Sequence, residues 1–306
     1  MRRRDLLHAF AAVAATSPAR GEPAPLTRRF PKSGEAIPAV GLGTWLTFHV
    51  DVRDADAMAQ RRAVLERFFA SGGRLIDSSP MYSSAEEVLG ELLPAVLPGE
   101  RARTLFCAIK VWTPLESYGP AQMRRSLAHW KLARADLMQV HNLLNWRAHL
   151  KTLRAWKDEG RVRLIGVTTS HGNKHDEMRA LLERDAAPLD AMQITCNPAD
   201  RRAEPLMKMA ADRGLGVIVN RPFDGGALLR RLAAAPLPPL AAELACASWA
   251  ELVLKWQLAD PSVTCVIPAT TRADHAAQNL AALSGRLPDR RERGALGAVF
   301  DRVLNA

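Results

Sequence analysis

Eight short runs rich in apolar and β-branched residues alternate with longer segments of helical period along this chain. The runs, between residues 39 and 271, are AVGLGTW, GRLIDSS, TLFCAIKVW, ADLMQVHN, VRLIGVTTS, LDAMQITCN, GVIVNRPF and TCVIPATT. The segments between them repeat apolar residues at helical spacing, as at Leu150 and Leu153, and glycines such as Gly160 and Gly214 mark helix ends. Eight strand–helix units without a break in composition predict an α/β fold, a closed (β/α)8 TIM barrel rather than a doubly wound sheet.

The rest of the chain is consistent with one globular domain. Its 306 residues are 48% hydrophobic and 24% charged, enough to bury a sizeable core. The segment TRRFPKSGEAIP, residues 27–38, predicts a hairpin before the first barrel strand. The net charge of +10 comes from scattered Lys and Arg with no basic block and no interleaved aromatic patch, so we expect no nucleic-acid partner.

The first 21 residues, MRRRDLLHAFAAVAATSPARG, have the pattern of a twin-arginine export signal. Arg3 and Arg4 are followed by Leu6, Leu7 and an Ala-rich stretch too short to span a bilayer. We therefore predict a signal over 1–21, a barrel over 22–306 and a periplasmic location; the alternative is an ordinary basic tail on a cytoplasmic protein. Without the signal the net charge would be +7, and no later run is long enough for stable membrane insertion.

The cysteine and histidine spacing predicts no metal site. The four cysteines are far apart, at Cys107, Cys196, Cys246 and Cys265, and fit neither a zinc site nor a disulfide framework. We interpret them as small buried residues. Carboxylates and histidines are not clustered at metal-ligand spacing, which argues against a metal-dependent hydrolase.

Three consecutive predicted strands end in ionisable residues. The second ends at Asp77, the third at Lys110 and the fourth at His141, and Tyr82 lies in the loop after Asp77. In a barrel of this kind the carboxyl ends of the strands meet at one rim, where catalytic groups lie. An acid that follows an apolar strand needs a compensating partner, and Lys110 on the next strand could supply it.

These four side chains could together protonate a carbonyl oxygen. A neighbouring ammonium favours the phenolate form of a tyrosine, so we expect Lys110 to lower the pKa of Tyr82, with Asp77 holding Lys110 in place. His141 would orient a carbonyl oxygen by hydrogen bonding. Charge develops on that oxygen when hydride reaches the carbonyl carbon, and a positioned acid can neutralise it.

From about Ile37 to Leu283 the chain resembles the aldo/keto reductases. The motifs GLGTW, IDSSPMYSSAEEVLG, FCAIK, DLMQVHN, RLIGVTTS, MQITCN and VIPATTRADHAAQNL occur in the order that the family shows. The resemblance implies NAD(P)H-dependent reduction of aldehydes or ketones, with Tyr82 as proton donor, Lys110 and Asp77 as its tuning pair and His141 orienting the substrate. It also implies a small carbonyl substrate and NADPH as cofactor, with NADH possible.

The same resemblance implies where the cofactor and the substrate would bind. The cofactor residues would be Gly43, Thr44, Thr168, Thr169, Gln193, Asn220, Arg221, Thr270, Arg272, Gln278 and Asn279. Gln193 would lie near the nicotinamide amide, and the segment from Thr270 to Asn279 would hold the adenosine end. Trp45 and Trp112, each just past a strand end, could line an apolar substrate wall.

Two departures from the family pattern leave an alternative open. Asn220 and Arg221 stand where many relatives place an aromatic residue against the nicotinamide ring, and Ala269 stands where a phosphate-binding lysine is frequent. A cofactor-binding redox sensor or regulatory protein with little turnover is therefore the alternative function. The sequence leaves the physiological substrate and the oligomeric state open.

Overall fold

The computed structural model describes residues 25–185 and 188–305 of the chain. Its strands are β1 (Thr27–Arg29), β2 (Ala36–Pro38), β3 (Leu42–Gly43), β4 (Leu75–Asp77), β5 (Phe106–Val111), β6 (Ala135–Val140), β7 (Val162–Thr168), β8 (Ala191–Thr195), β9 (Gly216–Asn220) and β10 (Val263–Val266). The predicted signal over 1–21 lies outside the described residues.

The strands from β3 to β10 form one parallel sheet in sequence order. Parallel bridges from Val40 to Val266 and from Gly43 to Ala269 join its first and last members and close it on itself. The predicted (β/α)8 barrel is therefore confirmed. The predicted hairpin is also present, since β1 and β2 pair antiparallel before the barrel begins.

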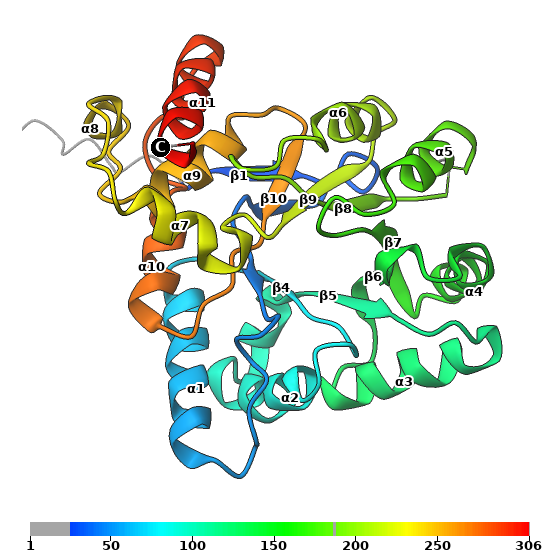
Figure 1. The fold of residues 1–306 in the computed structure, drawn as a ribbon. Coiled ribbons are helices and arrows are strands. Elements are labelled where there is room, and N and C mark those ends of the chain that lie inside the picture. Colours follow the sequence, from blue (N-terminus) through cyan, green and yellow to red (C-terminus); the bar gives the residue numbers. More distant parts are fainter. Residues whose placement is uncertain (1–24, 186–187, 306) are drawn as a thin grey trace, which may run out of the picture.

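Helices surround the strands, with α1 to α6 around one part of the barrel and α7 to α11 around the other (Figure 1). The longer helices are α1 (Ala55–Ala70), α2 (Ala85–Val96), α3 (Gly119–His129), α4 (Trp146–Asp158), α5 (His175–Asp185), α6 (Glu204–Asp212), α9 (Trp249–Leu258), α10 (Ala273–Ala281) and α11 (Arg290–Leu304). Shorter ones are η1 (Gly99–Thr104), η2 (Glu116–Tyr118), η3 (His141–Leu143), η4 (Asp224–Gly226), α7 (Ala227–Leu232) and α8 (Leu240–Glu243).

The helices end where the sequence predicted. Gly72, Gly160 and Gly214 each follow a helix and have positive φ angles between 72° and 87°. This left-handed conformation costs glycine little and stops helix propagation. Among the described residues, no helix is long and apolar enough to cross a membrane. The four cysteines are free and buried, as predicted.

The hairpin closes the amino-terminal end of the barrel. Phe30, between β1 and β2, stacks on Phe106 of β5 with ring centroids 5.3 Å apart, and both rings are fully buried. Glu35 in the hairpin pairs with Arg163 of β7 and lies 3.7 Å from Arg74. Apolar residues thus fill the barrel interior at this end, which leaves the opposite, carboxyl-terminal end for polar side chains.

Candidate active site

A buried ion pair lies inside the carboxyl-terminal end of the barrel. The Lys110 ammonium donates to Oδ1 of Asp77 and to the main-chain carbonyl of Ser78, 3.0 Å away. The Lys110 side chain is 0% exposed and that of Asp77 3%. Burial lowers the pKa of Lys110, while the charge of Asp77 opposes that change. The contact predicted between the strand-end acid and the lysine of the next strand is present.

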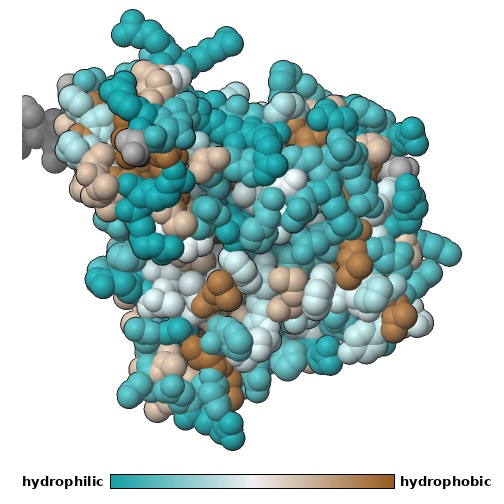
Figure 2. Space-filling model, in the orientation of Figure 1, coloured by the Kyte–Doolittle hydropathy of each residue, from teal (hydrophilic) through white to brown (hydrophobic). Residues whose placement is uncertain are grey.

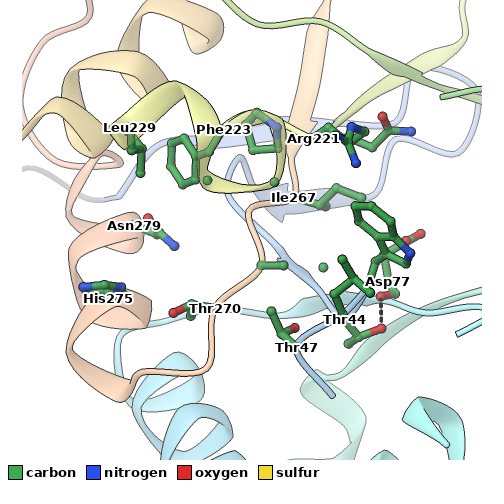
Figure 3. A pocket seen from close by; sticks show the side chains of 18 of the residues that line it. Thr44, Thr47, Asp77, Arg221, Phe223, Leu229, Ile267, Thr270, His275 and Asn279 are labelled. Atoms are coloured by element: carbon green, nitrogen blue, oxygen red, sulfur yellow. Dashed lines mark hydrogen bonds between the residues drawn. The ribbon is translucent and has the colours of Figure 1, made fainter. Parts of the chain in front are cut away.

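The second carboxylate oxygen of Asp77 accepts two amide hydrogen bonds. Nε2 of Gln193 lies 2.9 Å from Oδ2, and Nε2 of Gln139 lies 3.3 Å from it. The Thr44 hydroxyl donates to the main-chain carbonyl of Asp77 at 2.9 Å (Figure 3). Gln193, predicted near a cofactor amide, therefore already uses its amide nitrogen on Asp77. The amide of Gln139 was not predicted to take part at all.

His141 and Tyr82 lie edge to face, with ring centroids 5.6 Å apart. Nδ1 of His141 is 2.7 Å from the Ser79 hydroxyl, which accepts a hydrogen bond from the Met81 N–H. Burial, and then the charge of Lys110, keeps the pKa of His141 well below its usual value. The imidazole is therefore neutral, and a Ser79 hydroxyl that donates to Nδ1 leaves Nε2 as the protonated nitrogen.

The expected lowering of the Tyr82 pKa by Lys110 is wrong. Desolvation raises the pKa of the phenol well above its usual value, and the charge of Asp77 raises it further. The cation that lowers it is Arg221, not Lys110. The main physical reason is burial, because the phenolate would lose its hydration, and the nearby cations do not make up for that loss.

A cavity of about 520 Å³ opens above this polar layer. It runs from Asp77, Tyr82 and His141 at one end to Thr270, His275 and Asn279 at the other. Figure 3 shows Asp77 and Arg221 on one side of the cavity, with His275 and Asn279 of α10 on the opposite side. In Figure 2 the rim of this face is mostly hydrophilic, and less polar residues gather over its middle. The shape suits an extended ligand with polar groups at both ends.

The structure brings most of the predicted binding residues to this cavity. The lining includes Gly43, Thr44, Trp45, Asn220, Arg221, Thr270, Gln278 and Asn279. Thr168, Thr169, Gln193 and Arg272 are not among the lining residues, and neither is Trp112. The Trp112 side chain is instead partly exposed. Its main-chain N–H donates to the Gln122 amide oxygen, and its carbonyl accepts from the Gln122 amide nitrogen.

Asn220 and Arg221 at the end of β9 are engaged within the protein. The Asn220 amide accepts from Thr195 at 2.5 Å and donates to the Thr169 carbonyl at 2.9 Å. The Arg221 guanidinium carbon is 4.8 Å from the centroid of the Trp45 ring, and Nη2 donates to Asp224 at 2.7 Å. Its Nε and Nη1 are buried without a hydrogen-bond partner. Neither residue supplies an aromatic face.

At the far end of the cavity, His275 lies where the sequence had suggested Arg272. The Arg272 side chain is 61% exposed and forms a bidentate ion pair with Asp274 through Nε and Nη2. His275 lines the cavity and was missed. Its signal was the helical spacing 275, 278 and 279, which places three polar residues on one face of α10. His171, which the sequence suggested to be a surface residue, also lines the cavity, and its ring lies edge to face with that of Trp45 at a centroid distance of 5.9 Å.

The carboxyl-terminal mouth of this (β/α)8 barrel holds an ion pair, a phenol and a neutral imidazole. The fold and these groups together are those of an enzyme of the (β/α)8 barrel class. Within residues 25–185 and 188–305, no group of three or more His, Cys, Asp or Glu side chains is placed to hold a metal ion. The model of the Aldo/keto reductase family matches residues 39–291, and the chain belongs to that family of oxidoreductases.

Relatives and solved structures agree with this membership. Aldo-keto reductase family 1 member A1 of Sus scrofa is 25% identical over 281 residues, which cover 81% of this chain and 82% of the relative. An aldo/keto reductase from Klebsiella pneumoniae, in complex with NADP and acetate, has a TM-score of 0.75 at 24% identity and covers 89% of this chain and 95% of its own. Another from that organism, in complex with NADPH, has a TM-score of 0.74 at 24% identity, over 90% and 95%. At this identity the structural likeness establishes the fold.

Proposed function

We propose that this protein reduces aldehydes or ketones to alcohols with NADPH, and that Tyr82 is the proton donor. The observation that carries the proposal is the buried Asp77–Lys110 pair beneath Tyr82 and His141 at the mouth of the cavity. The family membership supports the reaction class, and the two Klebsiella pneumoniae proteins, which hold NADP or NADPH, support the choice of cofactor.

The residues of the cavity fit an extended dinucleotide. Thr270, Gln278 and Asn279 would contact the adenosine end, and Gly43, Thr44 and Asn220 lie nearer the catalytic end. A side chain on Gly43 would meet the Ile267 carbonyl at 2.8 Å, so glycine leaves the close strand contact intact at this edge of the cavity. Thr168, Thr169 and Gln193 lie below the lining and would act as its support. When bound, the dihydronicotinamide ring would supply the hydride.

The chain's own residues would supply the proton. His141 would donate from Nε2 to the carbonyl oxygen and orient it, and Tyr82 would transfer its hydroxyl proton to the same oxygen as charge develops there. The raised pKa of Tyr82 keeps the phenol protonated at neutral pH, so the acid form is ready for each turnover. The Lys110 ammonium, 5.3 Å from the Tyr82 ring centroid, would then stabilise the phenolate that remains.

A turnover assay with a panel of aldehydes and ketones and a fluorescence titration with NADPH and NADH test this function together. We expect NADPH oxidation that depends on the carbonyl substrate, and tighter binding of NADPH than of NADH. Purified protein that binds neither dinucleotide would contradict the proposal.

A second function, a dinucleotide-binding sensor or regulatory protein with little turnover, has one observation in its favour. Asn220 is hydrogen-bonded to Thr195 and Thr169, and Arg221 lies over Trp45, so neither residue offers an aromatic face to a nicotinamide ring. Tight NADPH binding together with negligible reduction across a panel of aldehydes and ketones would favour this function.

We also propose that the twin-arginine segment exports the folded barrel to the periplasm. The motivation is the Arg3–Arg4 pair followed by Leu6 and Leu7. Fractionation tests this: the mature protein should lie outside the inner membrane, and replacing Arg3 and Arg4 by lysine should retain it in the cytoplasm. Wild-type protein found only in the cytoplasm with Met1 to Arg20 attached would show an ordinary basic tail.

A further inference from the structure

We propose that Gln139 is a positioning residue for the proton donor, acting through Asp77. This inference rests on the proposed function, because it concerns the group that sets the acidity of Tyr82. Gln139 lies in β6, and its Cα pairs with that of Lys110 in β5. Residues that are paired in register point to the same face of a sheet, so both side chains enter the barrel interior. Gln139 is 0% exposed there.

The orientation of the Gln139 amide is dictated by Asp77. Oδ2 of Asp77 can only accept hydrogen bonds when the acid is ionised, so the amide presents Nε2 to it at 3.3 Å. The amide oxygen, Oε1, is then left buried with no partner. An unpaired buried acceptor costs free energy that an apolar side chain at this place would avoid. The hydrogen bond from Nε2 to Asp77 is the favourable contact of this amide that offsets the cost of its unpaired oxygen.

The neighbouring strand leaves room for this side chain. Gly166 in β7 pairs with Gln139, and a Cβ at Gly166 would lie 3.3 Å from Cγ of Gln139 and 2.8 Å from the Ala191 carbonyl. Glycine at this position therefore permits both the close approach of β8 and the placement of the glutamine under Asp77.

The Gln139 amide affects the pKa of Tyr82 through the negative charge of Asp77. Asp77 raises the pKa of Tyr82, and an amide hydrogen directed at its carboxylate partly offsets that negative charge. Gln193 provides the other such hydrogen at 2.9 Å. The two amides also fix the plane of the carboxylate, which keeps Oδ1 toward Lys110. Loss of Gln139 should make Asp77 less firmly held and Tyr82 a weaker acid.

Two substitutions separate this role from a structural one. Gln139→Leu removes the donor and should lower kcat about tenfold, the scale of one hydrogen bond to a charged group, with little change in KM. Gln139→Glu keeps the size and can donate to Asp77 while its new carboxyl is protonated. Its activity should be near wild type at acid pH and fall as the new carboxyl ionises, at a pKa well above the usual glutamate range because a second carboxylate is adjacent.

A spectroscopic measurement makes the test independent of turnover. The chain contains two tyrosines, Tyr82 and Tyr118, so a Tyr118→Phe background with tyrosine ¹³C-labelled at Cζ gives a single resonance, that of Tyr82. In Gln139→Glu this resonance should show an inflection at the pH where the new carboxyl ionises. Gln139→Leu should show no such inflection and should move the ionisation of Tyr82 to higher pH.

The outcomes are distinct. A Gln139→Leu enzyme with wild-type kcat and an unchanged Tyr82 resonance would overturn the proposal, and so would a Gln139→Glu carboxyl that titrates in the ordinary glutamate range. A lowered melting temperature with no change in either readout would mean that Gln139 is structural only. If the wild-type protein reduces no carbonyl compound, the proposed function fails, while the resonance of Tyr82 still decides the role of Gln139.

Discussion

The ammonium nitrogen of Lys110 lies 5.3 Å from the centroid of the Tyr82 ring while it donates a hydrogen bond to Asp77. The cation therefore stands over the aromatic ring and is paired at the same time. Before reaction, the phenol is held protonated by burial and by Asp77. After proton transfer, the phenolate would attract the same ammonium. The arrangement favours a tyrosine that gives up its proton only when a developing oxyanion takes it.

Tyr82→Phe should abolish carbonyl reduction and leave dinucleotide affinity nearly intact. The phenol would act on the oxyanion in the transition state, so its loss should cost about 10²–10⁴ in rate or more. Steady-state kinetics and a fluorescence titration measure the two effects. Tyr118→Phe is the matched control, because that ring is 39% exposed and belongs to the loop beyond β5. Near-normal turnover in Tyr82→Phe would remove this residue from the mechanism.

Lys110→Met should destabilise the fold by about 3–5 kcal/mol, because it leaves the Asp77 carboxylate buried without its counter-charge. Urea unfolding at fixed pH measures this loss. The control is Lys131→Met, whose ion pair with Glu91 has side chains 51% and 54% exposed and should change stability by less than about 1 kcal/mol. Equal small losses in both variants would show that Asp77 does not need its partner.

The preference for NADPH over NADH should depend on Arg272 and on its ion pair. Arg272→Ala should lower the preference about tenfold, since a guanidinium on the 2′-phosphate makes charge-assisted hydrogen bonds. Asp274→Ala should raise it, because the Arg272 side chain is then free of its 2.6 Å partner. Binding titrations of both dinucleotides to each variant provide the check. If instead His275→Ala alone changes the preference, the phosphate is recognised inside the cavity.

Stability should fall as pH rises from about 4.5 to about 7, because the buried carboxyl of Glu86 keeps its proton in the folded protein over this range. Burial raises the pKa of Glu86 to about 7, although the Ser126 hydroxyl, 2.8 Å from Oε2, opposes that rise. The unfolded chain releases this proton near pH 4.5, so the folded state holds more protons between about pH 4.5 and 7 and loses stability over that window. Glu86→Gln removes this contribution.

The variant should therefore gain stability relative to wild type with increasing pH, by about 3 kcal/mol in total. Chemical unfolding of both proteins at pH 5 and pH 8 measures the difference. A difference that is the same at both values would contradict the raised pKa.

The sequence predicted the barrel and three of the four groups at its mouth for one physical reason. Parallel strands place their carboxyl ends together, so residues such as Asp77, Lys110 and His141 can be found by locating strand ends. Side-chain direction within a strand or helix was harder to predict. In the sequence, nothing distinguishes Gln139 from an ordinary strand residue, because only its register with Lys110 shows that its side chain faces Asp77. Arg272 was expected from the family resemblance and from its place at the start of a helix, whereas the direction of the side chains on α10, which the sequence pattern did not reveal, brings His275 to the cavity.

The hairpin that packs Phe30 onto Phe106 closes the amino-terminal end of the barrel, and the cavity opens at the other end. Tyr82 lines that cavity, so protons as well as ligands can reach it from the carboxyl-terminal mouth. On the proposed mechanism, a molecule that occupies the cavity isolates the spent phenolate from bulk water. The Tyr82 phenolate would then be reprotonated only after the product leaves by the same mouth. Exchange of the Tyr82 hydroxyl proton for solvent deuterium should be no faster than release of the bound molecule from the cavity.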